Sequence, residues 1–278
     1  MKLSPKWSVA LIATVLSAAE LDPRLLRLIG PDAKFVGGID EERFAGSQLG
    51  KVFSGGNPFV RPARFAMAIT NSDGRMLSVR VYSAPIPGPE TEEPPLEYRG
   101  ARIWKSETSA EALLESSIAL HGDVQSITDA IDRWSAAVGP LSAAAAKAGR
   151  LSSSYDVWFL AFRPLEVPGS PASAVPLKHR AELVQAIEEA RGGIRLGAVD
   201  EASVEVDAKS PDEAAALAVI GRYLPGFVEI QEPHGAQSAL LALADRWDSR
   251  SEGRTATLSV SVAEFRIEEM LRAQRPEQ

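Results

Sequence analysis

Two short apolar runs joined by a polar turn limit the fold more than any other part of the chain. The runs cover residues 63–71 and 75–83, and the second alternates apolar with polar side chains, as a half-buried strand does. The segment between them, Asn71-Ser72-Asp73-Gly74, contains the glycine that tight hairpin turns favour. We therefore predict an antiparallel hairpin here.

The remaining apolar patterns mix strands and helices without strict alternation. Further strands are expected at 33–39, 98–104, 110–114, 117–121, 155–162, 194–199, 202–208, 241–248 and 255–261. Helices are expected at 41–53, 123–138, 177–191, 210–223 and from 261 onward, and a helix is the alternative for 109–120. A doubly wound parallel sheet needs strict alternation, so the order favours the α+β class. We predict a mainly antiparallel β-sheet with helices packed on one face.

Several of the predicted helices have recognisable ends. Asp40 and Asp123 are expected to cap the helices that follow them. Ser210 with Glu213, and Ser261 with Glu264, have the spacing of capping boxes. Gly192-Gly193 and Pro225-Gly226 are expected to end the helices before them.

The order of elements divides the chain into two halves of similar build. Each half begins with an apolar strand and a helix, continues with a hairpin and closes on a capped helix. Their sequence identity is too low to establish a duplication. The predicted organisation is a signal peptide at 1–19, an N-terminal α+β half at 20–140, a connector at 141–154, a C-terminal α+β half at 155–273 and a tail at 274–278.

The first nineteen residues have the parts of a secretory signal peptide. Lys2 and Lys6 precede an apolar run from Trp7 to Leu16, and Ser17-Ala18-Ala19 places small residues before Glu20. The run is too short to span a bilayer, and a buried N-terminal helix is the alternative. No cysteine follows for lipid attachment. We expect a soluble periplasmic or extracellular protein with no stable membrane anchor after cleavage.

The composition excludes several kinds of site. The absence of cysteine rules out disulfides, thiol nucleophiles and iron–sulfur clusters. A three-histidine metal site would need His121, His179 and His234 together. The net charge of −7 becomes −9 when Lys2 and Lys6 are removed, with 28 basic against 37 acidic residues, so no nucleic-acid partner is expected. We predict no metal and no cofactor.

The segment His121-Gly122-Asp123 is the nearest approach to an acid–base pair. With a serine, such a pair can form a hydrolytic site. A strand end followed by a helix cap explains the same residues, and this is the preferred interpretation. His179 and His234 are expected to be solvated, and no Gly-x-Ser-x-Gly, Walker or Gly-x-Gly-x-x-Gly motif is present. We therefore assign no catalytic, cofactor-binding or metal-ligating residue.

The tryptophans outside the signal segment lie among aliphatic residues. They are Trp104, Trp134, Trp158 and Trp247. Core packing is expected for them, and a carbohydrate or lipid groove is the alternative.

Part of the chain resembles a family of uncharacterised secreted bacterial proteins that is frequent in acidobacterial genomes. The resemblance is carried by LLRLIGPDAKFVGGIDEERFAGSQLG at 25–50, with further matches at 120–123, 129–133, 155–159, 210–217 and 257–264. The chain departs from the family at Gln48, where a proline is usual, and is short after Phe53. The resemblance implies an exported α+β protein and implies no activity.

The leading hypothesis is an exported, non-enzymatic binding or envelope structural module. Its partner would be an unknown protein or an apolar small molecule. Two alternatives stay open: a hydrolase assembled from distant residues with His121 or His234 as base, and a periplasmic carrier that holds an apolar ligand between sheet and helices.

Overall fold

The computed structural model describes residues 21–54, 63–89, 94–136, 139–163, 184–231 and 241–273. The predicted signal segment and the tail at 274–278 lie outside the described residues, as do His179 and His234.

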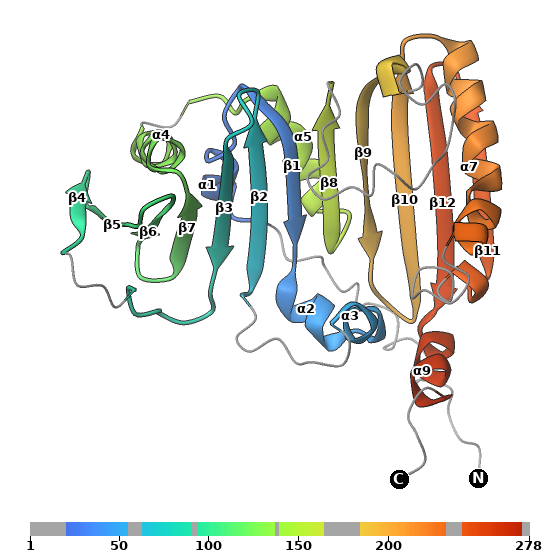
Figure 1. Ribbon diagram of the computed structural model, residues 1–278, viewed down its shortest axis with the longest axis horizontal. Coiled ribbons are helices and arrows are strands. Elements are labelled where there is room, and N and C mark those ends of the chain that lie inside the picture. The colour runs from blue at the N-terminus through green and yellow to red at the C-terminus, as the bar shows by residue number, and fades with distance from the viewer. Residues whose placement is uncertain are drawn as a thin grey trace, which may run out of the picture.

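Twelve strands within this part of the chain form one sheet (Figure 1). The strands are β1 (Ala33–Ile39), β2 (Phe65–Asn71), β3 (Met76–Val81), β4 (Leu96–Tyr98), β5 (Ala101–Lys105), β6 (Ala110–Leu114), β7 (Ile118–Gly122), β8 (Val157–Phe162), β9 (Ile187–Arg195), β10 (Val199–Ala208), β11 (Arg246–Glu252) and β12 (Thr255–Ala263). The helices are α1 (Pro23–Leu26), α2 (Glu41–Gly46), α3 (Gln48–Phe53), α4 (Val124–Ser135), α5 (Ala143–Ser152), α7 (Pro211–Gln231) and α9 (Glu264–Ala273).

The sheet is antiparallel and continuous, which confirms the predicted α+β class. Its order is β11-β12-β10-β9-β8-β1-β2-β3-β7-β6-β5-β4. The two halves meet where β1 pairs with β8, with Gly37 opposite Phe159. The halves therefore share one sheet.

The strand order outward from this junction repeats. The N-terminal half runs β1, β2, β3, β7, β6, and the C-terminal half runs β8, β9, β10, β12, β11. In each half the third strand from the junction pairs with the second strand of a later hairpin, so β3 pairs with β7 and β10 pairs with β12. A helix follows that second strand in both halves, α4 after β7 and α9 after β12. The insertions differ, because β4 and β5 precede the hairpin in one half and α7 precedes it in the other.

The sheet has two faces, which we call the back face and the front face. The back face carries Val36, Leu120 and Leu160, and the front face carries Ala68, Gly37 and Phe159. Cross-strand neighbours share a face, so these assignments extend along each ladder. Figure 1 looks onto the front face.

The main core lies behind the N-terminal half. Large aliphatic side chains of the back face pack against α1, α4 and α5, and Leu28, Leu120 and Ile127 are fully buried. The predicted connector at 141–154 contributes α5, whose Ala145 and Ala148 are buried in this core. The connector is thus part of the fold.

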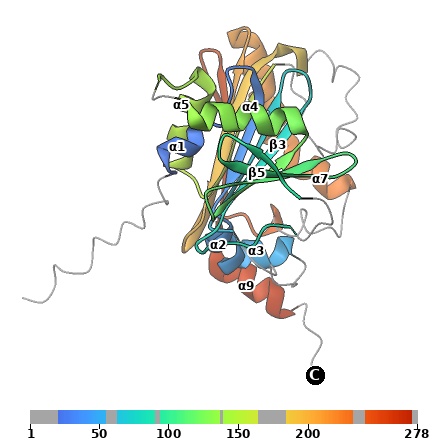
Figure 2. The ribbon, with the colours of Figure 1, turned by 90° about the vertical axis from the view of Figure 1, so that its left-hand side faces the viewer.

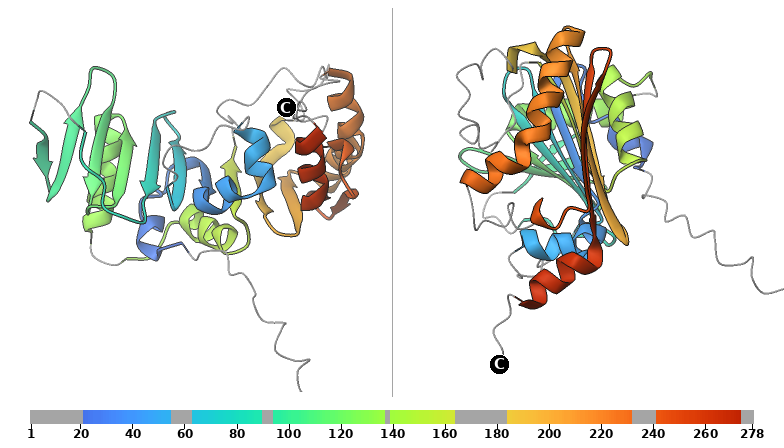
Figure 3. Two further views of the ribbon diagram at one scale, coloured as in Figure 1. Left: turned by 90° about the horizontal axis from the view of Figure 1, so that it is seen from below. Right: turned by 90° about the vertical axis from the view of Figure 1, so that its right-hand side faces the viewer.

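The C-terminal half carries its long helix on the opposite face. Ala214 and Ala218 of α7 pack on Ala208 and Ala256 of the front face. Figures 2 and 3 show α1 and α5 on one side of the sheet and α7 on the other. The helices that pack behind the N-terminal half, α1, α4 and α5, lie on the back face, whereas α7 of the C-terminal half lies on the front face.

A third cluster closes the lower end of the front face. Phe44 of α2, Leu49 of α3 and Ile267 of α9 are buried together with Leu196. The predicted single helix at 41–53 is two helices, because Ser47 ends α2 in an extended conformation and caps α3 through the Gly50 N–H.

The expected helix at 177–191 is wrong for the residues that the structure describes from 187 onward. Residues 187–195 form β9, which pairs with β8 on one side and β10 on the other. Two complete ladders outweigh the helix propensity of Glu188, Glu189 and Ala190. Gly192 and Gly193 lie inside the strand, where their missing side chains allow close approach of neighbouring groups.

Other boundaries also differ. The single strand expected at 98–104 is a hairpin of β4 and β5, because Arg99 and Gly100 both have positive φ. The expected helix alternative for 109–120 is wrong, since β6 and β7 pair there. The helix expected to end at 223 continues through Pro225.

The helix starts at Asp40, Asp123 and Ser210 are confirmed by side-chain acceptors for backbone N–H groups. At the second expected capping box, Ser261 instead lies inside β12, paired with Glu201.

Candidate functional site

The structure separates the two residues of the predicted acid–base pair. Asp123 caps α4, where it accepts hydrogen bonds from the N–H and Oγ–H of Ser126 at 2.9 and 2.6 Å. His121 lies in β7 on the front face, and its Nδ1 is 3.6 Å from Oε1 of Glu111 in β6. The carboxylate beside the histidine is therefore not the one that sequence spacing suggested.

Core packing is confirmed for two of the tryptophans. Trp104 and Trp158 are buried. Trp134 is half-buried beneath the guanidinium of Arg24, and the Trp247 Nε1–H donates to the Gly221 carbonyl of α7 at 3.1 Å.

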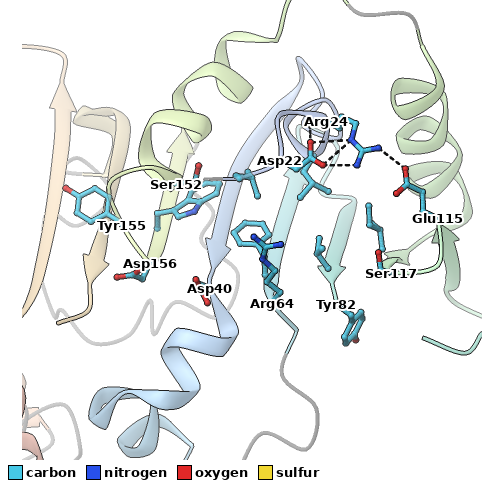
Figure 4. A pocket seen from close by; sticks show the side chains of 16 residues that line it. Asp22, Arg24, Asp40, Arg64, Tyr82, Glu115, Ser117, Ser152, Tyr155 and Asp156 are labelled. Carbon is cyan, nitrogen blue, oxygen red and sulfur yellow. Dashed lines mark hydrogen bonds and ion pairs between the residues drawn. The ribbon is translucent and has the colours of Figure 1, made fainter. Parts of the chain in front are cut away.

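A small cavity of about 240 Å³ opens at the lower end of the back face (Figure 4). Leu25 and Trp158 contribute to its apolar wall. At its rim, Arg24 pairs with Asp22 at 2.9 Å and with Glu115 at 2.8 Å. Both carboxylates thus already share one cationic partner within the chain.

The two other carboxylates of this cavity also have structural partners. Asp40 accepts the Arg43 N–H at 2.9 Å as the cap of α2. Burial raises the pKa of Asp40, and the negative charge of Asp156 adds to this rise against the opposing hydrogen bond from Arg43. Asp156 is buried, pairs with Arg43 and accepts the Leu196 N–H at 2.7 Å. Asp40 and Asp156 therefore serve mainly to connect α2, the start of β8 and the β9–β10 turn.

A mainly apolar concavity of the described residues lies on the front face at the middle of the sheet. It is an open groove of about 640 Å³. We call it the apolar groove; it is lined by Phe35, Gly37, Gly38, Ile39, Ala66, Met67, Ala68, Ser78, Val157, Trp158, Phe159, Gly193, Ile194, Ala202 and Val204. Ser78 carries the only polar side chain among these lining residues.

The floor of the apolar groove is a cross-strand row perpendicular to the strands. The row runs Ser78, Ala68, Gly37, Phe159, Gly192, Val204. At about 4.8 Å between neighbouring strands, the five strands from Ser78 to Gly192 span about 19 Å. Ala68 and Gly37 are small, but Phe159 stands in the same row and the Phe35 ring lies over Gly37, so two aromatic rings rise from the floor.

The arrangement of helices explains why this surface is not covered by a described helix. The helices of the N-terminal half pack on the back face, and α7 packs on the front face of β10 and β12. Figure 1 shows α7 beyond β10 and α2 and α3 at the lower end, with no described helix in front of the middle of β1, β2, β8 and β9. An apolar sheet face is therefore left between them.

Sequence reasoning assigned none of the groove residues to a site. One signal was present: a glycine pair at 37–38 and alanines at 66 and 68 lie within apolar runs, and a second glycine pair stands at 192–193. Glycine inside a strand often marks close approach of a ligand or another backbone. The register that brings these residues onto one face is not visible in the sequence, because it depends on pairing of β1 with β8.

The described residues contain neither a metal-binding cluster nor a membrane-spanning helix. No group of three or more histidine, aspartate or glutamate side chains there is arranged to hold a metal ion. Among the helices of the same residues, none has the length and apolar character needed to cross a bilayer.

No protein-family model and no curated protein matches the chain. Among solved structures, it is similar to crystal form I of the treponemal protein TP0453, with a TM-score of 0.50, 9% identity, and coverage of 92% of this chain and 98% of that chain. Crystal form IV gives a TM-score of 0.46, 8% identity, and coverage of 91% and 97%, and form III gives 0.46, 8%, 92% and 99%. At this identity, the likeness to form I supports the α+β fold alone.

Proposed function

We propose that this chain is an exported binding protein whose apolar groove holds an acyl chain. The observation that carries the proposal is the groove itself, where apart from Ser78 the side chains that the front face contributes are apolar, while Met67 and Trp158 belong to the core behind the sheet. Its volume of about 640 Å³ lies within the range of small-molecule sites, roughly 300–1,000 Å³. The Lys2, Lys6 and Ser17-Ala18-Ala19 pattern supports export.

The shape of the groove favours a thin, elongated ligand. Its floor carries Ala68 and Gly37 beside the rings of Phe35 and Phe159, and the row runs across five strands for about 19 Å. Burial of each methylene contributes about 0.8 kcal/mol, which is about fourfold in affinity. Affinity should therefore rise with chain length until the groove is filled.

The test is equilibrium binding of a fluorescent fatty acid, with displacement by unlabelled fatty acids of increasing length. Ala68→Glu places a charge on the groove floor between Gly37 and Ser78. We expect affinity to fall at least about tenfold, because an acyl chain in the groove would strip water from the new carboxylate.

The matched control is Thr257→Glu on the opposite, polar face of the same sheet. Thr257 lies opposite Arg250, which can pair with the new carboxylate, and on its other side opposite Glu205, whose carboxylate already pairs with Arg191. This variant should bind the fatty acid as the unaltered chain does. Equal affinity in Ala68→Glu would contradict the proposal, and a change in oligomeric state on sedimentation would show that a second copy occupies the groove instead.

Export has its own test. N-terminal sequencing of the protein from an exporting host should give Glu20 as the first residue. An intact Met1, or a start well beyond residue 25, would contradict it.

A further inference from the structure

Three chemically complementary side chains stand side by side at one end of the apolar groove. Ser78 of β3 lies opposite His121 of β7, and His121 lies opposite Glu111 of β6. Because β7 runs between β3 and β6, the imidazole has a hydroxyl on one side and a carboxylate on the other. The three residues extend the same cross-strand row that forms the groove floor.

The orientation of the imidazole fits this order. Its Nδ1 faces Oε1 of Glu111 at 3.6 Å, beyond hydrogen-bond distance, and both side chains are 54% exposed. The other ring nitrogen, Nε2, therefore points away from Glu111. Ser78 and His121 are directly opposed in the antiparallel pair, which puts their Cβ atoms about 4.5–5.5 Å apart, and no hydrogen bond joins the two side chains in this structure. Catalytic hydrogen bonds commonly tighten only when substrate binds.

A second concavity adjoins this row. A cleft of about 450 Å³ lies between Ser78, His121 and Glu111 on one side and the segment Ile86-Pro87-Gly88-Pro89 on the other. The segment is anchored where the Ile86 N–H donates to the Ser116 carbonyl at 2.9 Å. Ser78 lines both the cleft and the apolar groove. A molecule with an apolar chain in the groove would therefore place its head group at Ser78.

A cationic side chain also lines the cleft. Arg80 lies two residues along β3 from Ser78 on the same face, because side chains alternate along a strand. Its terminal nitrogen pairs with Glu41 at 2.7 Å, and its Nε is buried with no hydrogen-bond partner among the described residues. Positive donors near a reacting carbonyl stabilise the oxyanion that forms there.

We propose that Ser78, His121 and Glu111 hydrolyse carboxylic esters with an apolar acyl chain. This inference rests on the proposed function, because the groove supplies the acyl-chain site. Ser78 is the nucleophile, His121 the general base and Glu111 the residue that orients and charge-balances the imidazole.

The chemistry needs only water as co-reactant. The Ser78 Oγ bonds to the ester carbonyl carbon, and its proton passes to His121 Nε2. The bond from that carbon to the alcohol oxygen breaks, and His121 returns the proton to the departing alkoxide. Water then attacks the acyl-serine and gives a proton to His121, which passes it to the Ser78 oxygen as the carboxylic acid leaves.

The first experiment uses p-nitrophenyl esters with acyl chains from two to twelve carbons. Turnover should increase with chain length, and Ser78→Ala and His121→Ala should each reduce it at least about 100-fold. His234→Ala and Ser259→Ala are the matched controls and should retain the unaltered rate. Glu111→Gln should lower kcat and leave KM nearly unchanged.

A fluorophosphonate probe tests the nucleophile directly. Mass spectrometry should locate the adduct on Ser78, and the adduct should be absent in His121→Ala. Thermal unfolding of each variant shows whether it folds, and Asp123→Ala should lose stability but keep turnover per folded molecule.

The outcomes separate the two proposals. A chain that binds the fluorescent fatty acid but shows no turnover and no Ser78 adduct overturns the hydrolase inference and leaves the binding function standing. Turnover and a Ser78 adduct without fatty-acid binding or chain-length preference would retain the catalytic row and overturn the acyl-chain groove. Turnover that survives Ser78→Ala overturns the catalytic assignment.

Discussion

The two halves of the sheet repeat a strand order but bury their helices in different ways. Behind the N-terminal half, large side chains such as Leu28, Leu120 and Ile127 fill the space between sheet and helices. In front of the C-terminal half, the buried contact with α7 is made by alanines, among them Ala214 and Ala218. One half is thus held by side-chain volume and the other by close approach of a helix to the sheet.

The uncovered faces of the two halves differ as well. The back face of the C-terminal half carries Arg191, which pairs with Glu205 at 2.8 Å and with Asp207 at 2.5 Å. A paired polar face is stable in water without a cover. The front face near β1 and β8 is apolar, and no described helix covers it. The change of helix-bearing face therefore leaves apolar surface at the centre of the molecule.

The largest expected effect is in the core of the N-terminal half. Leu120→Ala removes a fully buried side chain and leaves a cavity, so the free energy of unfolding should fall by about 2–5 kcal/mol. Chemical denaturation measures it, with the exposed Leu96→Ala as control, expected within about 0.5 kcal/mol of the unaltered chain. Equal losses in both variants would contradict the core assignment.

The C-terminal half should respond to the opposite change. Ala214→Leu forces a larger side chain between α7 and the sheet, which should destabilise the protein by about 1–3 kcal/mol. Ala216 is exposed on the same helix, so Ala216→Leu should be nearly neutral. A higher denaturation midpoint for Ala214→Leu would contradict the claim that α7 packs closely on the sheet at this position.

The start of α7 offers a smaller test. The Glu213 N–H donates to Ser210 Oγ at 3.3 Å. Ser210→Ala should lower the free energy of unfolding by about 1 kcal/mol and leave fatty-acid affinity unchanged. If Ser210→Ala left the denaturation midpoint unchanged and weakened fatty-acid binding, Ser210 would contact the ligand and would not cap α7.

The smallest effect is expected at Asp200 of β10. Burial raises the pKa of its carboxyl, and the Glu264 and Asp156 charges add to the rise against a hydrogen bond from the Gly197 N–H. A raised pKa means that the folded state holds the proton more tightly than the unfolded state, so stability is lost as pH rises through the interval between the two pKa values.

Asp200→Asn removes that charge. We expect a higher Tm than the unaltered chain at pH 7 and no difference near pH 3, where the carboxyl is protonated in both states. A gain of equal size at both pH values would assign the effect to packing instead.

Much of the fold could be predicted because local chemistry determines it. Asp40, Asp123 and Ser210 cap helices where sequence spacing placed them, and Asn71–Gly74 forms its turn. The error over 187–191 has a tertiary cause: pairing with β8 and β10 makes a strand from residues with helix propensity.

The candidate sites could not be predicted in the same way. Proximity in sequence makes Asp123 the nearest acid–base partner of His121, and the sequence favours a strand end and a helix cap for the two, whereas the carboxylate that faces the imidazole is Glu111 on the neighbouring strand β6. In the sequence, Ser78 is one of several polar residues that alternate with apolar ones in the predicted strand, and nothing there distinguishes it as a site residue. Cross-strand register brings these residues together, and it depends on which strands pair.

Photocrosslinking with a diazirine-bearing fatty acid tests the central claim, that the change of helix-bearing face leaves an acyl-chain site on the front of the sheet. The probe is irradiated with the full-length mature protein, and crosslinked peptides are identified by mass spectrometry. Crosslinks should fall on the strands that carry Phe35, Ala68 and Phe159, and Ala68→Glu should remove them while Thr257→Glu does not. Crosslinks confined to the cavity beside Leu25 and Trp158, or crosslinks unaffected by Ala68→Glu, would contradict the account.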